Sequence, residues 1–129
     1  MDTDEHRWEV NRVSEKIIGC AFTVSNALGC GFLEKVYENA LAHELRKARL
    51  RVRQQYPIKI YYDGIVVGEY EADLLVEECV LVELKAIKTL TGKEQAQCLN
   101  YLKATKLPLC LLINFGNPKV EIKRFAGLF

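Results

Sequence analysis

Residues 69–86 restrict the fold of this chain more than any other segment, because two apolar runs lie on either side of an acidic turn. If residues 77–79 form the turn of a β-hairpin, Asp73 lies directly opposite Glu83. Side chains alternate between the two faces of a strand. One face is then wholly apolar and is expected to be core: Ala72, Leu74, Val76, Val80, Val82, Leu84 and Ala86. The other face holds all the charges together with two leucines: Glu71, Asp73, Leu75, Leu81, Glu83 and Lys85.

The opposed carboxylates of this hairpin need a counter-charge, since like charges directly opposite each other on a sheet are destabilising. Mg²⁺ takes oxygen ligands and is usually held by one or two carboxylates together with substrate phosphate oxygens. Asp73 and Glu83 therefore predict a divalent-ion site with Lys85 beside it. The alternative is an exposed edge hairpin with solvated charges, because the surface is the commonest location of Asp, Glu and Lys.

Two helices are expected before the hairpin. Apolar residues recur at three- and four-residue spacing from about residue 5 to residue 28, which predicts an amphipathic helix that ends at the glycines 29 and 31. A second helix is expected from about Leu33 to Ala48. Its apolar arc includes both Glu34 and Tyr37, so the Glu34 carboxylate is expected to point along the buried face. Alternatively, Glu34 only favours the first helical turn through the macrodipole. Tyr37 is expected in the core, with its hydroxyl reaching the same cleft.

Strands and a third helix follow. Strands are expected over 52–62, 65–76 and 80–86, with Asp63-Gly64 as a hairpin turn, and Pro57 indicates an edge position for the first strand. A third helix should run from about residue 92 to residue 105. It places Gln97 one turn from Tyr101 and one turn from Lys93, on one side of the helix. The alternative to a functional role is that these residues form only a polar stripe that faces solvent.

The apolar run 108–115 predicts a central strand that is buried on both faces. Because it follows a helix, it is expected to pair in parallel with the strand before that helix. A last strand is expected over 119–125, with Val120 and Ile122 facing inward.

A basic run connects the second helix to the first strand: Arg46, Lys47, Arg49, Arg51 and Arg53. It is the densest positive cluster available to meet a phosphate backbone, although such a run is ordinarily a solvated face. The formal net charge of the chain is only +1, so any nucleic-acid surface must be a local patch.

Composition excludes several classes of protein. The 129 residues are 50% hydrophobic and 27% charged, which fits a single globular domain over residues 1–129. No apolar run approaches the roughly 20 residues that span a bilayer, and the acidic amino terminus differs from a secretory signal, so a cytoplasmic protein without a membrane partner is expected. Five scattered cysteines and two histidines argue against a disulfide framework and against a zinc site.

Three motifs occur in a specific order: Gly31-x-x-Glu34-x-x-Tyr37, then Asp73 with Glu83-Leu84-Lys85, then Gln97-x-x-x-Tyr101. Together they resemble the PD-(D/E)XK nuclease superfamily, and the first motif matches the GxxExxY family within it. The resemblance covers about residues 29–115. One position differs: Ala72, directly before Asp73, replaces the Pro of the motif that names the superfamily. The expected order α-α-β-β-β-α-β-β contains the αβββαβ core of that superfamily, an α/β (α+β) fold with a mixed sheet.

The resemblance implies a metal-dependent nuclease that hydrolyses phosphodiester bonds, with DNA preferred over RNA as substrate. It implies one or two Mg²⁺ or Mn²⁺ ions, bound by Glu34, Asp73, Glu83 and the backbone carbonyl of Leu84. Lys85 would orient or deprotonate the attacking water, and Gln97 and Tyr101 would orient the substrate or the metal site. The residues expected to bind nucleic acid are Tyr37, Arg46, Arg49, Arg51, Arg53 and Lys93.

The alternative is a catalytically silent module that keeps this fold and binds nucleic acid or oligomerises. A homodimer is also expected, because a domain of this size has little surface to spare for a substrate groove and the first helix offers additional apolar area. The sequence leaves endonuclease and exonuclease activity open.

Overall fold

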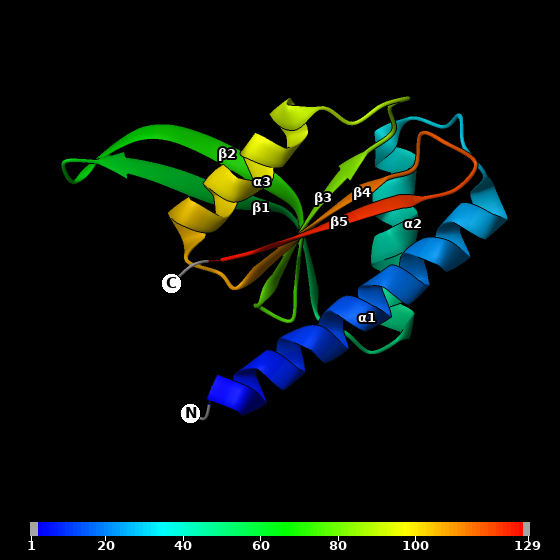
Figure 1. Ribbon diagram of the computed structural model, residues 1–129, viewed down its shortest axis with the longest axis horizontal. Coiled ribbons are helices and arrows are strands. Elements are labelled where there is room, and N and C mark those ends of the chain that lie inside the picture. The colour runs from blue at the N-terminus through cyan, green and yellow to red at the C-terminus, as the bar shows by residue number, and fades with distance from the viewer. Residues whose placement is uncertain (1–2, 128–129) are drawn as a thin grey trace.

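The computed structural model describes residues 3–127, which form three helices and one five-stranded sheet (Figure 1). The elements follow the expected order: α1 (Thr3–Leu28), α2 (Glu34–Lys47), β1 (Val52–Tyr62), β2 (Ile65–Val76), β3 (Val80–Lys85), α3 (Gly92–Thr105), β4 (Leu109–Asn114) and β5 (Glu121–Ala126). None of these helices is long and apolar enough to cross a bilayer.

The strands lie in the sheet in the same order as in the chain, β1-β2-β3-β4-β5. Only β3 and β4 are parallel, and α3 makes the crossover between them. The predicted edge position of Pro57 is confirmed, since β1 has a neighbour on one side only. All six residues of β4 are buried, as the apolar run predicted for a central strand.

Helices cover both faces of the sheet (Figure 1). On one face α1 and α2 bury a first core, to which α1 contributes residues at the spacing of a helix: Val10, Val13, Ile17, Ala21 and Val24. On the other face α3 buries a second, smaller core with Cys98, Tyr101 and Leu102. A capping box at Thr91 and Glu94 fixes the start of α3.

The hairpin of β1 and β2 changes face halfway along its length. Its pairing is regular up to Gln54 and Leu74 and resumes at Tyr56 and Ala72. Between these pairs, Gln55 has a left-handed backbone with φ 54°, a conformation that few residues other than glycine adopt. The register is the same on both sides of Gln55, but the side chains of Leu74 and Ala72 belong to different cores. The distal half of the hairpin curves over α3 (Figure 1).

This change of face corrects one prediction. Ala72 was expected on the same apolar face as Leu74 and Val76. Instead it packs with Ile58 and Leu81 on the α3 face, whereas Leu74 and Val76 pack under α1 and α2. The expected face assumed an uninterrupted alternation of side chains along β2, and the strand does not keep that alternation between Ala72 and Leu74.

Candidate active site

Asp73 lies where β2 and β3 stop pairing. Their antiparallel register includes Val76 with Val80 and Leu74 with Val82, as the three-residue turn predicted. Asp73 is the next residue after the last pair, Leu74 with Val82. Its Oδ2 atom accepts a 2.7 Å hydrogen bond from the backbone N–H of Leu84. The carboxylate is thereby fixed against the backbone of the neighbouring strand.

Glu83 is a buried acid with an oxygen that lacks a partner. Its residue is only 4% exposed, and Oε1 makes no hydrogen bond in the part of the chain that the structure describes. Oε2 lies 3.7 Å from Nζ of Lys85. Because buried polar atoms are nearly always paired, the unpaired oxygen calls for a hydrogen-bond donor or a cation beside it.

The electrostatics of the two acids agree with this reading. Burial, followed by the neighbouring Asp73 carboxylate, raises the pKa of Glu83 to about 8, although Lys85 opposes the shift. Burial also raises the pKa of Asp73, against the hydrogen bonds from Leu84 and Gln55. The site therefore lacks positive charge, and a divalent cation between the acids would lower both pKa values.

Glu34, the first residue of α2, faces this pair of acids as expected. It is half-buried, and its pKa is raised by burial and by the Asp73 carboxylate. The start of α2 has no side-chain cap, since Leu33 occupies the capping position. The inward direction predicted for Glu34 is therefore correct.

Glu38, one turn later in α2, is an acid of the site that the sequence analysis missed. It is 2% exposed and accepts hydrogen bonds from Lys35 (2.9 Å), Gln54 (2.7 Å) and Gln55 (2.7 Å). Gln55 also donates to Asp73 Oδ1 at 3.4 Å. Glu38 therefore holds the left-handed residue of β1 against Asp73. Its position one turn after Glu34 on the apolar side of the helix was the available signal.

The donor set fits a hard divalent ion held by two protein carboxylates. Among the described residues, no three His, Cys, Asp or Glu side chains are close enough to form a ready-made metal site. Asp73 and Glu83 nevertheless lie together, and Mg²⁺ commonly uses one or two carboxylates, with water and phosphate oxygens completing its octahedron. Glu34 is within electrostatic reach of both acids, but it does not complete a three-carboxylate group.

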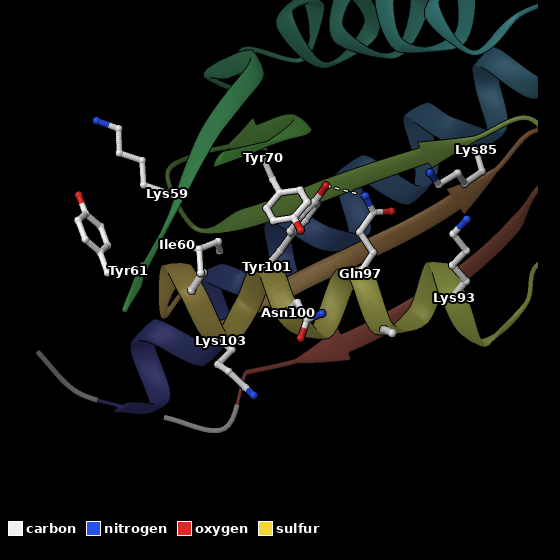
Figure 2. A pocket seen from close by; sticks show the side chains of 12 residues that line it. Lys59, Ile60, Tyr61, Tyr70, Lys85, Lys93, Gln97, Asn100, Tyr101 and Lys103 are labelled. Carbon is white, nitrogen blue, oxygen red and sulfur yellow. Dashed lines mark hydrogen bonds between the residues drawn. The ribbon is translucent and has the colours of Figure 1, made fainter. Parts of the chain in front are cut away.

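Lys85, Gln97 and Tyr101 meet on the α3 face of the sheet. Gln97 Nε2 donates a 2.8 Å hydrogen bond to the Tyr101 hydroxyl, which in turn donates to the backbone carbonyl of Glu71 at 3.3 Å. Gln97, Tyr101, Lys85 and also Lys93 line one groove of about 700 Å³ (Figure 2). Gln97 and Tyr101 therefore do not form a stripe that faces only solvent.

The segment after Lys85 is anchored to the end of β4. Lys85 O accepts a 2.8 Å hydrogen bond from the backbone N–H of Phe115. The buried Asn114 side chain binds both the N–H and the carbonyl of Ile87, at 3.0 Å and 2.8 Å. A Cβ atom at Gly116 would lie 1.9 Å from Ile87 O, so only glycine permits this approach. These contacts fix the backbone from which the Lys85 side chain extends.

Tyr37 is not where a nucleic-acid contact requires it. The residue is fully buried and its ring stacks on Phe115 at 4.7 Å. Its hydroxyl donates to Gly29 O at 2.7 Å and accepts from Phe32 N at 3.2 Å. The hydroxyl therefore orders the connection between α1 and α2, and the predictions that it reaches the cleft and binds nucleic acid were wrong.

The arginines expected to meet a phosphate backbone lie around the start of β1 and the turn between β2 and β3: Arg46, Arg49, Arg51 and Arg53. This turn adjoins the first residue of β3, whereas Lys85 is the last residue of that strand. Arg51 pairs with Glu77 at 3.2 Å and Arg53 with Glu78 at 3.1 Å. Part of the positive charge of this run is therefore already neutralised within the fold.

Comparisons with known proteins agree with this architecture. A family model described as the PD-(D/E)XK nuclease superfamily matches residues 11–125. The crystal structure of SSO0001 is similar, with a TM-score of 0.51 and 15% sequence identity. The similar region covers 74% of this chain and 50% of that one, and at this identity the likeness shows the fold alone. No curated protein is similar enough in sequence to match.

Proposed function

Because the chain belongs to the PD-(D/E)XK nuclease superfamily, we propose that it hydrolyses phosphodiester bonds of nucleic acid with the help of a divalent metal ion. One observation carries the proposal. The buried Oε1 atom of Glu83 has no hydrogen-bond partner among the described residues, although it lies in a site shared with the Asp73 carboxylate and the Lys85 ammonium.

Asp73 and Glu83 would hold Mg²⁺ or Mn²⁺, with the Leu84 carbonyl and Glu34 as further candidate ligands. When bound, such an ion polarises a phosphoryl oxygen and lowers the pKa of a bound water. The fixed direction of the Asp73 carboxylate, set by its bond to Leu84, pre-organises one side of the ion site. Glu38 is a positioning residue, since it acts on Asp73 through Gln55.

Lys85 would stabilise the negative charge that develops on the phosphate and would orient or deprotonate the attacking water. Its side chain is 22% exposed, so the ammonium can reach a bound substrate while it remains beside Glu83. Gln97 and Tyr101 are held to each other and to β2. This linkage gives them a fixed orientation toward a phosphate at Lys85.

Several finer assignments belong to the same proposal. The motif of Glu34 favours the GxxExxY branch of the superfamily, and DNA is the proposed substrate in preference to RNA, with the cytoplasm as the location. A homodimer through α1 is supported by the exposed rings of Trp8 and Phe22, which are 66% and 42% exposed. Light scattering that gives a monomer at micromolar concentration would exclude the dimer.

The proposal is tested by incubating the purified protein with single-stranded and duplex DNA and RNA in Mg²⁺, in Mn²⁺ and in EDTA. Cleavage should require metal and should be lost in Glu83→Gln. The matched control is Glu78→Gln, because Glu78 is an exposed acid in the same hairpin whose partner is Arg53. If the wild type cuts none of the substrates in either metal, or if Glu83→Gln cuts at the wild-type rate, the proposal is wrong.

A further inference from the structure

The bent hairpin creates a basic and aromatic groove against α3 that the motifs do not account for. Four lysines are among the residues that line it: Lys59, Lys85, Lys93 and Lys103. Among the residues that the structure describes, no Asp or Glu lines this groove. Lys59, Lys93 and Lys103 are exposed and, within residues 3–127, form no ion pair. Lys59 lies opposite Glu69 in the hairpin and Lys85 lies beside Glu83, so Lys93 and Lys103 supply the unpaired positive charge of the groove.

Tyrosine rings lie in the groove between these charges. Tyr61 and Tyr70 are 62% and 53% exposed, which is unusual for large rings. The Tyr70 ring lies beside that of Tyr101, with centroids 6.1 Å apart and planes tilted by 52°. The Tyr70 and Tyr101 rings lie together beside α3, whereas the Tyr61 ring and the Lys59 side chain point to the other side of β1 (Figure 2). Aromatic faces interleaved with cations are the combination that binds unpaired bases and their phosphates.

The groove is continuous with the candidate active site. Figure 2 shows Lys85 and Lys93 at one end and Lys59 and Tyr61 at the other, with Tyr70 and Tyr101 between them. Lys93 and Lys103 are ten positions apart in α3, which corresponds to about 15 Å of helix. A strand of a few nucleotides in the groove would therefore end beside Lys85.

We infer that this groove binds a single-stranded stretch of nucleic acid next to the phosphate that is cut, an inference that rests on the proposed function. The absence of carboxylates from the lining favours a polyanion over an apolar protein segment. Bases in a duplex are stacked on each other and cannot offer their faces to Tyr70. The groove therefore selects an unpaired strand, by stacking and charge and without reading a sequence.

Binding is measured separately from cleavage, by fluorescence anisotropy of the Glu83→Gln protein in EDTA. The probes are a mixed-sequence oligonucleotide of about 16 nucleotides, within the range of single-strand sites, as DNA, as RNA and as a DNA duplex. Both single strands should bind more tightly than the duplex. Tyr70→Ala should weaken single-strand binding about 10-fold, whereas Tyr70→Phe should retain it. Tyr62→Ala is the control, because Tyr62 is 74% exposed but does not line the groove.

The charge of the groove is tested with the double variant Lys93→Ala/Lys103→Ala, because both lysines lie on α3 and line the groove. Each phosphate contact to a single strand contributes about 0.7 to the slope of log affinity against log salt, so the slope should fall by about 1.4. The control Lys16→Ala/Lys119→Ala removes the same charge from exposed lysines outside the groove and should keep the wild-type slope. Thermal melts check that all variants are folded.

The outcomes separate the two proposals. If the wild type cuts nucleic acid but the groove variants bind single strands as the unaltered protein does, the groove inference is wrong and the proposed function stands. If single strands bind in the groove but nothing is cut in either metal, the proposed function is wrong and the groove stands. Duplex binding that is as tight as single-strand binding and insensitive to Tyr70→Ala also overturns the inference.

Discussion

The carboxylate of Asp73 and the backbone N–H of Leu84 are joined by a 2.7 Å hydrogen bond between two strands at the point where their regular pairing ends. The same carboxylate thus serves both the sheet and the candidate metal site. Its two roles can be separated by substitution, because an amide retains a carbonyl oxygen that accepts from Leu84, whereas a methyl group does not.

Asp73→Asn should abolish metal-dependent cleavage while the protein melts no lower than the wild type. Asp73→Ala should also lose cleavage but should cost about 1–3 kcal/mol of unfolding free energy, because it leaves the Leu84 N–H without its partner. Urea denaturation and a cleavage assay of both variants measure the two effects. Cleavage by either variant at the wild-type rate would remove Asp73 from the site.

Lys85→Met should slow cleavage by roughly 10²–10³-fold, the size of effect seen when a transition-state charge donor is removed. Metal binding should remain, since an ammonium is not a ligand. Isothermal titration with Mn²⁺ measures the second part, and Lys88→Met, a change at an exposed lysine three residues later, is the control. An equal loss of metal binding and cleavage in Lys85→Met would contradict this division of roles.

Gly116→Ala should destabilise the protein by roughly 2–4 kcal/mol, because its Cβ would lie 1.9 Å from the backbone oxygen of Ile87 and neither backbone can yield cheaply. The contrasting change is Gly19→Ala. Gly19 lies within α1 with nothing near its added Cβ, so alanine should stabilise the helix by about 0.5–1 kcal/mol. Chemical denaturation of both variants is the measurement, and a neutral Gly116→Ala would mean that the Ile87 segment is not held as described.

The elements were predictable because local patterns specify them. Helical spacing in α1, the Asp63-Gly64 turn and the apolar run of β4 each depend on neighbours in sequence. The pair Asp73 and Glu83 was also predictable, since charges at inward positions of a strand contradict the pattern around them.

The remaining features depend on contacts between distant segments. Gln55 has no local reason to adopt a left-handed backbone; Glu38 and Asp73 hold its side chain from elsewhere in the chain. The groove lies where the distal half of the hairpin passes α3. Tyr70, Lys93 and Lys103 are ordinary residues in isolation, and nothing in their sequence spacing predicts that they line one groove.

The last prediction concerns the effect of metal on stability. Without metal, Glu83 has a pKa raised to about 8, so its proton stabilises the folded protein. This stabilisation is fully present below the ordinary carboxyl pKa and is lost as the pH rises through about 8. The wild type in EDTA should therefore lose stability between roughly pH 5 and 8, and Glu83→Gln should lose less, because its amide does not titrate.

Metal should reverse this loss. An ion that binds only the folded protein raises its stability by mass action, by about 2.7 kcal/mol at a hundred times the dissociation constant. Because protons compete for the same carboxylates, millimolar Mg²⁺ or Mn²⁺ should raise the melting temperature more at pH 8 than at pH 6. Glu83→Gln should show little of this response, and Na⁺ at matched ionic strength should not reproduce it. Thermal melts in which Na⁺ acts as strongly as Mg²⁺ and Mn²⁺ would leave the unpaired Glu83 oxygen without a cation, and would favour a binding module that has lost catalysis.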